Sequence, residues 1–177
     1  TKAPIIASHS SARAVCDNPR NLTDDQLRAL AKNGGVVQIC FLAAYVKTPP
    51  VVPEREKALK ELEARYGNFR EIRDEAVRKE AMAAREALNQ KFPQARATVQ
   101  DLVDHIDHVR KVVGIDYVGI GTDFDGGGGV VGCDDVSGMV HVTEELVRRG
   151  YTDREIGKIW GGNFFRVFEK VIDLAGK

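Results

Sequence analysis

The sequence predicts an α/β fold with parallel strands that forms the end of a larger barrel or sheet. Short apolar runs alternate along the 177 residues with longer stretches at helical spacing, which is the element order of a parallel α/β fold. Three strands are too few to form a closed domain, because a three-stranded parallel sheet would expose large apolar faces to solvent. We therefore expect the beginning of the barrel or sheet to lie upstream, and the start at Thr1 rather than Met agrees with this.

The three runs predicted to be buried strands are segments 4–8, 36–42 and 117–122. Each is short and apolar and is bounded by loop residues, as expected of strands that are covered on both faces. The first and third runs lead directly into polar residues, so polar and ionisable side chains are expected at the ends of two strands.

Capping signals predict where the helices begin. One capping box starts a helix over residues 23–32, and a second starts a helix over residues 98–113, whose apolar residues form a single stripe. Two further helices, over residues 136–149 and 152–174, are expected to close the chain.

A charged insertion, Pro53 to Phe92, interrupts this alternation and is rich in Ala, Glu, Arg and Lys. Its apolar residues recur at helical spacing: Leu59, Leu62, Tyr66, Phe69 and Ile72. The pattern predicts one long helix or a helical hairpin interrupted at Gly67-Asn68. We expect it to be an insertion within one catalytic barrel domain, of which residues 1–177 form the C-terminal portion. We interpret the charge as a solvated face, and we expect the insertion to project near the active-site face, as a lid or as the contact of a homodimer.

Composition excludes several functions. The 26 basic and 26 acidic residues cancel, so no nucleic-acid partner is expected. The longest apolar run, residues 34–46, is too short to span a bilayer. Cys16, Cys40 and Cys133 have no metal-binding spacing, so we expect small buried residues or free thiols, with one disulfide as the alternative in an oxidising compartment.

Candidate catalytic residues follow two of the predicted strands. His9 comes after the first, and Asp123 and Asp125 come after the third, ahead of four glycines. In parallel α/β folds the carboxyl ends of strands carry the site, because the loops converge there. An imidazole can bind zinc and a carboxylate can move a proton, so these residue types suit metal-assisted hydrolysis.

Other histidines and glycines fit less well. His105 and His108 are three apart, whereas a two-histidine zinc site on a helix uses a spacing of four with a Glu between, so we interpret both as structural or surface residues. Nothing distinguishes His141. Residues 126–129 could form a phosphate loop, but no Lys-Ser/Thr follows them.

Five segments, in order, carry the pattern of one family. They are 4–12 (P-I-I-A-S-H-S-S-A), 20–25 (R-N-x-x-D-D), 104–108 (D-H-I-D-H), 119–126 (G-I-G-T-D-F-D-G) and 162–167 (G-N-x-x-R-V). Together they resemble the C-terminal portion of the renal (membrane) dipeptidase family of zinc metallopeptidases. The resemblance covers most of the chain apart from the charged insertion.

The resemblance implies a (β/α)8 TIM barrel of the amidohydrolase type with two zinc ions. The three strands would be the sixth, seventh and eighth of that barrel. The remaining ligands of the family, a His-x-Asp pair, a bridging Glu and a second His, would come from the N-terminal half of the same barrel. That half is therefore an expected partner, and the fragment alone is expected to be incomplete as an enzyme.

By the same resemblance, His9 matches a zinc ligand and Asp123 matches the aspartate that takes a proton from the nucleophilic water. Arg20 matches the arginine that holds the substrate's terminal carboxylate, and Tyr45 would line the substrate pocket. The expected function is zinc-dependent hydrolysis of dipeptides. Two alternatives stay open: another metal hydrolase acting on a lactone, phosphoester or cyclic amide, against which Arg20 argues, and a non-catalytic barrel scaffold.

Overall fold

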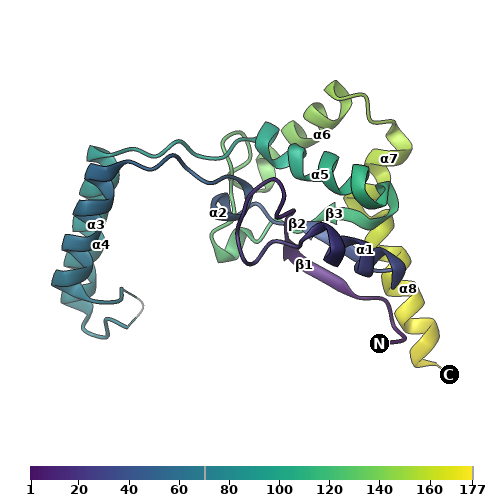
Figure 1. Ribbon diagram of the computed structural model, residues 1–177, viewed down its shortest axis with the longest axis horizontal. Coiled ribbons are helices and arrows are strands. Elements are labelled where there is room, and N and C mark those ends of the chain that lie inside the picture. The colour runs from purple at the N-terminus through teal and green to yellow at the C-terminus, as the bar shows by residue number, and fades with distance from the viewer. Residues whose placement is uncertain (70, 177) are drawn as a thin grey trace. The chain divides into compact units, whose positions relative to one another are not determined.

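The computed structural model describes residues 1–69 and 71–176, and the chain divides into two compact units. The first contains Thr1–Thr48 and Arg96–Lys177, and the second contains Pro49–Ala95. Figure 1 labels the helices and strands of both units. Among the described residues, every helix is too short or too polar to traverse a lipid bilayer.

The sheet of the first unit has three parallel strands, β1 (Ile6–Ser10), β2 (Val36–Ile39) and β3 (Val118–Ile120), in the order β1-β2-β3. The pairing of β1 with β2 contains an irregularity between Ala7 and Ser10, which is where the strand approaches its carboxyl end. The predicted α/β fold with parallel strands is confirmed. Its assignment to the last three strands of a barrel stays a prediction.

The strand limits differ from the predicted ones. β1 continues to Ser10, because pairing with Ile39 extends that far, so His9 lies within the strand rather than after it. β2 ends at Ile39 because the chain turns into the short helix α2 (Ala43–Val46), although Phe41 is still fully buried. β3 likewise ends earlier than predicted. An apolar run predicts which residues are buried, and residues remain buried after the hydrogen-bonded strand has ended.

Two predicted helices begin where the capping boxes placed them. α1 (Asp24–Lys32) follows Thr23 and α5 (Val99–Val113) follows Thr98, and each cap has both of its reciprocal hydrogen bonds. The two helices pack against each other and against β2 (Figure 1). Fully buried side chains between them and the sheet include Leu27, Val37, Ile39, Leu102, Val103, Ile106 and Val118.

The two closing helices are present but are not uniform. The predicted helix at 136–149 begins with one turn of 3-10 helix and continues as α6 (Met139–Arg148). The last predicted helix is divided into α7 (Asp153–Gly157), a π-helical segment (Lys158–Gly162) and α8 (Asn163–Ala175). π-Helical turns inside α-helices often occur at functional sites.

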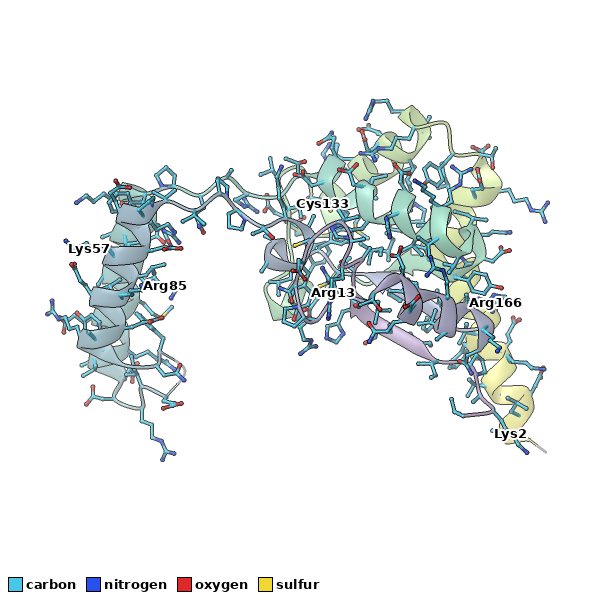
Figure 2. All side chains as sticks on the ribbon, in the orientation of Figure 1. Lys2, Arg13, Lys57, Arg85, Cys133 and Arg166 are labelled. Carbon is cyan, nitrogen blue, oxygen red and sulfur yellow. The ribbon has the colours of Figure 1, made fainter. Side chains whose placement is uncertain are left out.

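Two polar side chains of α8 attach it to the sheet. Asn163 is 2% exposed, and its amide donates to the backbone carbonyls of Ile115 and Val118. Arg166, labelled in Figure 2, donates to three backbone carbonyls beside the amino ends of β2 and β3. The closing G-N-x-x-R-V segment therefore has an architectural role at the end of the sheet opposite the candidate site.

The second unit is a helical hairpin, which is one of the two predicted alternatives. It consists of α3 (Pro53–Tyr66) and α4 (Glu75–Lys91), packed side by side. The buried guanidinium of Arg55 joins them, because it donates to the backbone of Phe92 and to the side chain of Asn89.

Two residues of the predicted helical stripe lie instead in the connection between α3 and α4. Gly67, at φ 68°, ends α3, and Asp74 caps α4 by accepting from the backbone three residues on. Phe69 and Ile72 fall between these two signals. Phe69 is held there in part by Arg85, whose guanidinium carbon lies 5.4 Å from the ring centroid.

Candidate active site

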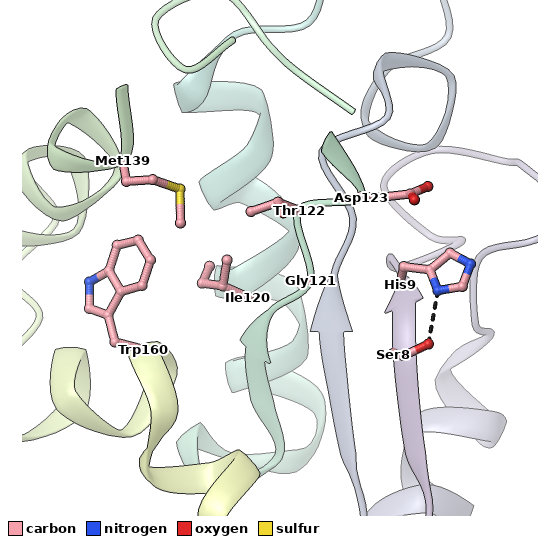
Figure 3. Close-up of a pocket in the computed structure, with 8 residues that line it drawn as sticks. All are labelled: Ser8, His9, Ile120, Gly121, Thr122, Asp123, Met139 and Trp160. Carbon is pink, nitrogen blue, oxygen red and sulfur yellow. Dashed lines mark hydrogen bonds between the residues drawn. The ribbon is translucent and has the colours of Figure 1, made fainter. Parts of the chain in front are cut away.

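A hollow of about 440 Å³ opens at the carboxyl end of the sheet (Figure 3). Eight residues line it: Ser8, His9, Ile120, Gly121, Thr122, Asp123, Met139 and Trp160. His9 comes from β1 and Asp123 from the loop after β3, so the fold brings together two of the sequence-predicted residues from the two outer strands. Trp160 comes from the π-helical segment, whose irregularity therefore lies beside the hollow.

Glycines allow the outer strands to approach each other over β2. A Cβ atom at Gly121 would lie 2.2 Å from the carbonyl oxygen of Ser8 and 2.7 Å from Cβ of Gln38. A Cβ atom at Gly119 would lie 1.9 Å from the side-chain oxygen of Gln38. At Gly121 the obstacle is the backbone of β1, so a side chain there would push β1 and β3 apart, whereas at Gly119 the Gln38 side chain would have to move.

Asp123 is held in a strained backbone conformation. Its φ of 57° and ψ of 35° are left-handed, and among the described non-glycine residues it is the one with positive φ. Such strain costs on the order of 1–3 kcal/mol and clusters at functional sites. The conformation is maintained because the Asp123 carbonyl accepts from the backbone N–H groups of Gly126 and Gly128, at 3.0 and 2.7 Å.

The four-glycine loop stabilises the turn at Asp123 through its backbone hydrogen bonds. All four of its N–H groups donate within the chain: those of Gly126 and Gly128 to Asp123, that of Gly127 to Phe124 and that of Gly129 to Phe41. With these donors already used, the loop has none left for a phosphate, and the weak phosphate-loop reading is not supported.

A thiol adjoins the Asp123 carboxylate. Cys40 follows β2, and its Sγ lies 3.9 Å from Oδ2 of Asp123 while accepting from the backbone N–H of Leu42 at 3.4 Å. Burial raises the pKa of the Cys40 thiol, and the Asp123 charge adds to this while Arg20 opposes it. The thiol thus remains protonated and can donate weakly to the carboxylate. Sequence reasoning missed this contact, because a single cysteine in an apolar run carries no signal of its neighbour.

All three cysteines are buried free thiols, as expected, and the described part of the chain contains no disulfide.

His9 has an exposed imidazole with one ring nitrogen engaged. Nδ1 lies 2.8 Å from the hydroxyl oxygen of Ser8 (Figure 3). When the proton is on Nδ1 it donates to Ser8, and the Nε2 lone pair is then available to a metal. The described residues contain no group of three or more His, Cys, Asp or Glu side chains arranged around one ion. A metal ion bound at His9 would therefore need further ligands from beyond the described residues.

Arg20 and Tyr45 form a second pair, beside the hollow rather than in its lining. Arg20 lies in the loop between β1 and α1, and its guanidinium carbon is 5.9 Å from the centroid of the Tyr45 ring on α2. That distance is within the range of a cation–π contact. Within the described residues no carboxylate pairs with Arg20, which is exposed, so its planar donors are available to a ligand.

The remaining histidines make structural contacts. His105 on α5 is fully buried and contacts backbone atoms on both sides of its ring. Nε2 of His108 lies 2.6 Å from Oδ1 of Asp24 on α1, and Nδ1 of His141 lies 2.6 Å from the carbonyl oxygen of Gly132. None of the three lines the hollow, in agreement with the structural interpretation of His105 and His108.

A histidine and an aspartate at the carboxyl edge of a parallel α/β sheet are residue types that suit metal-assisted hydrolysis. The chain belongs to the membrane dipeptidase family, peptidase family M19, whose model matches residues 1–177.

Characterised relatives and solved structures agree with this membership. The chain is 33% identical over 176 residues to dipeptidase ataJ of Aspergillus terreus, covering 99% of this chain and 32% of the relative. It is 31% identical over 178 residues to dipeptidase 3 of Rattus norvegicus, covering 100% and 27%.

Among solved structures, the probable dipeptidase PvdM from Pseudomonas aeruginosa matches with a TM-score of 0.77 and 38% identity, over 97% of this chain and 46% of that one. A metallo peptidase from Rhodobacter sphaeroides, liganded with a phosphinate mimic of the dipeptide L-Ala-D-Ala, matches with a TM-score of 0.67 and 25% identity, over 96% and 37%. The chain thus spans about a third or less of these curated relatives and less than half of these solved structures.

Proposed function

We propose that the protein to which this chain contributes is a zinc-dependent dipeptidase. The observation that carries the proposal is the hollow shared by His9 and Asp123, with the unpaired guanidinium of Arg20 in the adjoining loop. Family membership supports it, as do the dipeptide mimic in the Rhodobacter sphaeroides structure and the names of the relatives.

In this proposal each residue has a distinct task. His9 is a zinc ligand through Nε2, with its ring oriented by Ser8. Two zinc ions are expected, and bound zinc acts as a Lewis acid that lowers the pKa of water toward about 7. Asp123 accepts the proton of the attacking water and delivers it to the departing amine. The turn fixes the backbone of Asp123, whose carboxylate extends toward the side of the sheet on which His9 lies (Figure 3).

Arg20 binds the terminal carboxylate of the substrate, for which a planar guanidinium offers a matched pair of donors. Tyr45, which lies outside the lining of the described hollow, supports the guanidinium with its ring and would border the substrate pocket of the complete barrel. This pair favours dipeptides over lactones, phosphoesters and cyclic amides, which lack a terminal carboxylate. The distance between the zinc ions and Arg20 would therefore select substrates of dipeptide length that end in a free carboxylate.

We further propose that β1, β2 and β3 are the sixth to eighth strands of a (β/α)8 barrel. β1 and β3 are edge strands in the described sheet, and unpaired edges need a partner strand or a cover. Phe165, Phe168 and Ile172 on α8 are each about half exposed. The N-terminal half of the same barrel is the partner that would cover these surfaces and contribute the other zinc ligands.

The test uses the full-length protein loaded with zinc. Release of free alanine from L-Ala-L-Ala and L-Ala-D-Ala is measured beside hydrolysis of a lactone, a phosphoester and a cyclic amide, and metal content is determined by elemental analysis. We expect dipeptide hydrolysis that is lost on chelation and restored by zinc. Hydrolysis of the other substrates alone would favour the second candidate, and no hydrolysis with no bound metal would favour a scaffold.

A further inference from the structure

We propose that His105, on the outer helix α5, is a positioning residue that fixes Arg20 and Tyr45 relative to each other. This rests on the proposed function, because those two residues are assigned to the substrate carboxylate. The D-H-I-D-H segment that contains His105 has no part in the chemistry described above, and its histidine lines no part of the hollow.

His105 connects two segments that are far apart in sequence. Its ring is 0% exposed. Nδ1 accepts from the backbone N–H of Ala12 at 3.0 Å, and Nε2 donates to the backbone carbonyl of Val46 at 2.8 Å. These two bonds require a neutral ring with its proton on Nε2. Burial lowers the pKa of His105, which keeps the ring in that neutral form.

Each of these bonds reaches a segment that carries a candidate residue. Ala12 lies at the start of the loop that leads to Arg20, and Val46 directly follows Tyr45 on α2. A buried apolar side chain at position 105 could fill the same space, but it could not bond to either segment. The polar ring therefore sets the distance between the loop and α2.

Asn21 makes a second connection at the same place. It is 1% exposed, and its amide donates to the carbonyls of Cys16, within the loop, and of Tyr45, at 2.9 and 2.8 Å. The last two carbonyls of α2 thus both accept from buried side chains. α2 has four residues and no side-chain cap at its start. Because so short a helix has little stability of its own, α2 depends on these two bonds and on those from Asn18 and Cys16 to the Ala44 carbonyl. The bond from His105 is the one among them that comes from outside the loop.

The backbone of Arg20 is fixed from both sides as well. Its N–H donates to the side chain of Asn18 at 2.9 Å, and its carbonyl accepts from the hydroxyl of Ser10 at 2.9 Å. The 5.9 Å distance between the guanidinium carbon and the centroid of the Tyr45 ring therefore depends on the placement of the loop and of α2. Releasing either segment should loosen the carboxylate site without touching Asp123.

The experiment compares His105→Ala, His105→Asn and His105→Gln in the full-length enzyme. Asn can place an acceptor near Nδ1 and keep the bond from Ala12, and Gln can place a donor near Nε2 and keep the bond to Val46. Measured quantities are KM and kcat for L-Ala-L-Ala and for its C-terminal amide. His108→Asn is the matched control, because it breaks a hydrogen bond from the same helix to Asp24 on α1, rather than one to Ala12 or to α2.

We expect His105→Ala to raise KM for the free dipeptide by about tenfold or more, the effect of losing a buried hydrogen bond, with a smaller change in kcat. The preference for the free dipeptide over its amide should fall in parallel, and the Asn and Gln variants should each recover part of it. His108→Asn should lower the Tm without changing that preference.

Two outcomes overturn the proposal. One is a His105→Ala enzyme that loses thermal stability but keeps the wild-type KM and the wild-type preference. The other is a loss of preference equal in the His105 and His108 variants. If the wild type does not hydrolyse dipeptides, the proposed function fails, and crystal structures then decide: α2 and Tyr45 should be displaced in His105→Ala and not in His108→Asn, and an undisplaced α2 overturns the positioning role.

Discussion

Sγ of Cys40 lies 3.9 Å from Oδ2 of Asp123, which places a buried thiol directly against the carboxylate of the candidate general base. The two residues come from neighbouring strands, Cys40 from the end of β2 and Asp123 from the turn after β3. Burial, and then the Asp123 charge, raise the pKa of the thiol, so the carboxylate faces a neutral donor rather than a second anion. The reactivity of the Cys40 thiol therefore depends on the charge of Asp123.

The contact between Cys40 and Asp123 predicts that the reactivity of the thiol depends on the carboxylate charge. In a full-length protein with Cys16 and Cys133 replaced by Ser, Cys40 should react with iodoacetamide much more slowly than a free thiol at pH 8, because its raised pKa leaves little thiolate. Asp123→Asn removes the negative charge that helps raise that pKa, so the reaction should become faster. The rate is measured by mass spectrometry, with Asp125→Asn as the control. Equal rates in the wild type and Asp123→Asn would contradict the electrostatic contact.

A second prediction concerns stability in acid. Glu145 on α6 is 3% exposed, and its hydrogen bond to Arg148, together with Arg149, lowers its pKa to about 2. A depressed folded-state pKa stabilises the protein above the ordinary Glu value, and this stabilisation is lost as the pH falls toward 2. Glu145→Gln should therefore be less stable at pH 7 and should show a flatter decline between about pH 5 and pH 2. Urea unfolding of the full-length protein across this range measures both, and parallel curves would contradict the prediction.

The sequence predicted well wherever a local signal and the tertiary environment agree. Thr23 and Thr98 have both the side chain and the partner that a capping box needs, so α1 and α5 begin where expected. His9 was expected just after a strand, yet it lies inside β1, because strand pairing continues through a polar sequence that reads as a loop. Boundaries of this kind depend on the neighbouring strand, which a local pattern does not contain.

Contacts across the site could not be predicted from local patterns at all. The resemblance drew attention to His9, Arg20 and Asp123, but not to the contact of Cys40 or to the bonds of His105. The contact of Cys40 with Asp123 spans 83 residues of sequence, and the bonds of His105 to Ala12 and Val46 span 93 and 59. Their residue types are ordinary for buried positions, so only the fold distinguishes them from packing.

The insertion gives a third prediction. Because Pro49–Ala95 forms its own unit, joined internally by Arg55, replacing residues 53–92 with a short Gly-Ser linker should leave the rest of the protein folded. Circular dichroism should show a loss of helix with cooperative unfolding retained. Activity on a panel of dipeptides and sedimentation then separate a role as a lid from a role in a homodimer. An unfolded product would show that the first unit depends on the insertion for its folding.

A fourth prediction separates the metal ligand from the base. His9→Ala should reduce both zinc content and activity, since it removes a ligand. Asp123→Asn should keep zinc while kcat falls by at least about 10²–10⁴-fold, the usual contribution of general acid–base catalysis. Asn tolerates the left-handed backbone of residue 123, so this change isolates the charge. His141→Ala, at an exposed histidine outside the hollow, is the control. Full zinc content in His9→Ala would remove His9 from the ligand set.

The last prediction tests Arg20 with a substrate that lacks the terminal carboxylate. A dipeptide amide has no terminal carboxylate, so the wild type should strongly prefer the free dipeptide, and Arg20→Ala should lose most of that preference. Truncating one partner of a charged hydrogen bond costs roughly 2–5 kcal/mol, and part of this loss can appear in kcat, since distant binding energy helps to orient the scissile bond.

Arg28→Ala is the matched control, because Arg28 is an exposed arginine of α1 that pairs with Asp25. Arg20→Lys should restore charge without the planar pair of donors, and so recover only part of the preference. If Arg20→Ala and the wild type discriminate equally between the free dipeptide and its amide, then Arg20 does not bind the carboxylate, and the choice of dipeptides over other substrates loses its structural basis.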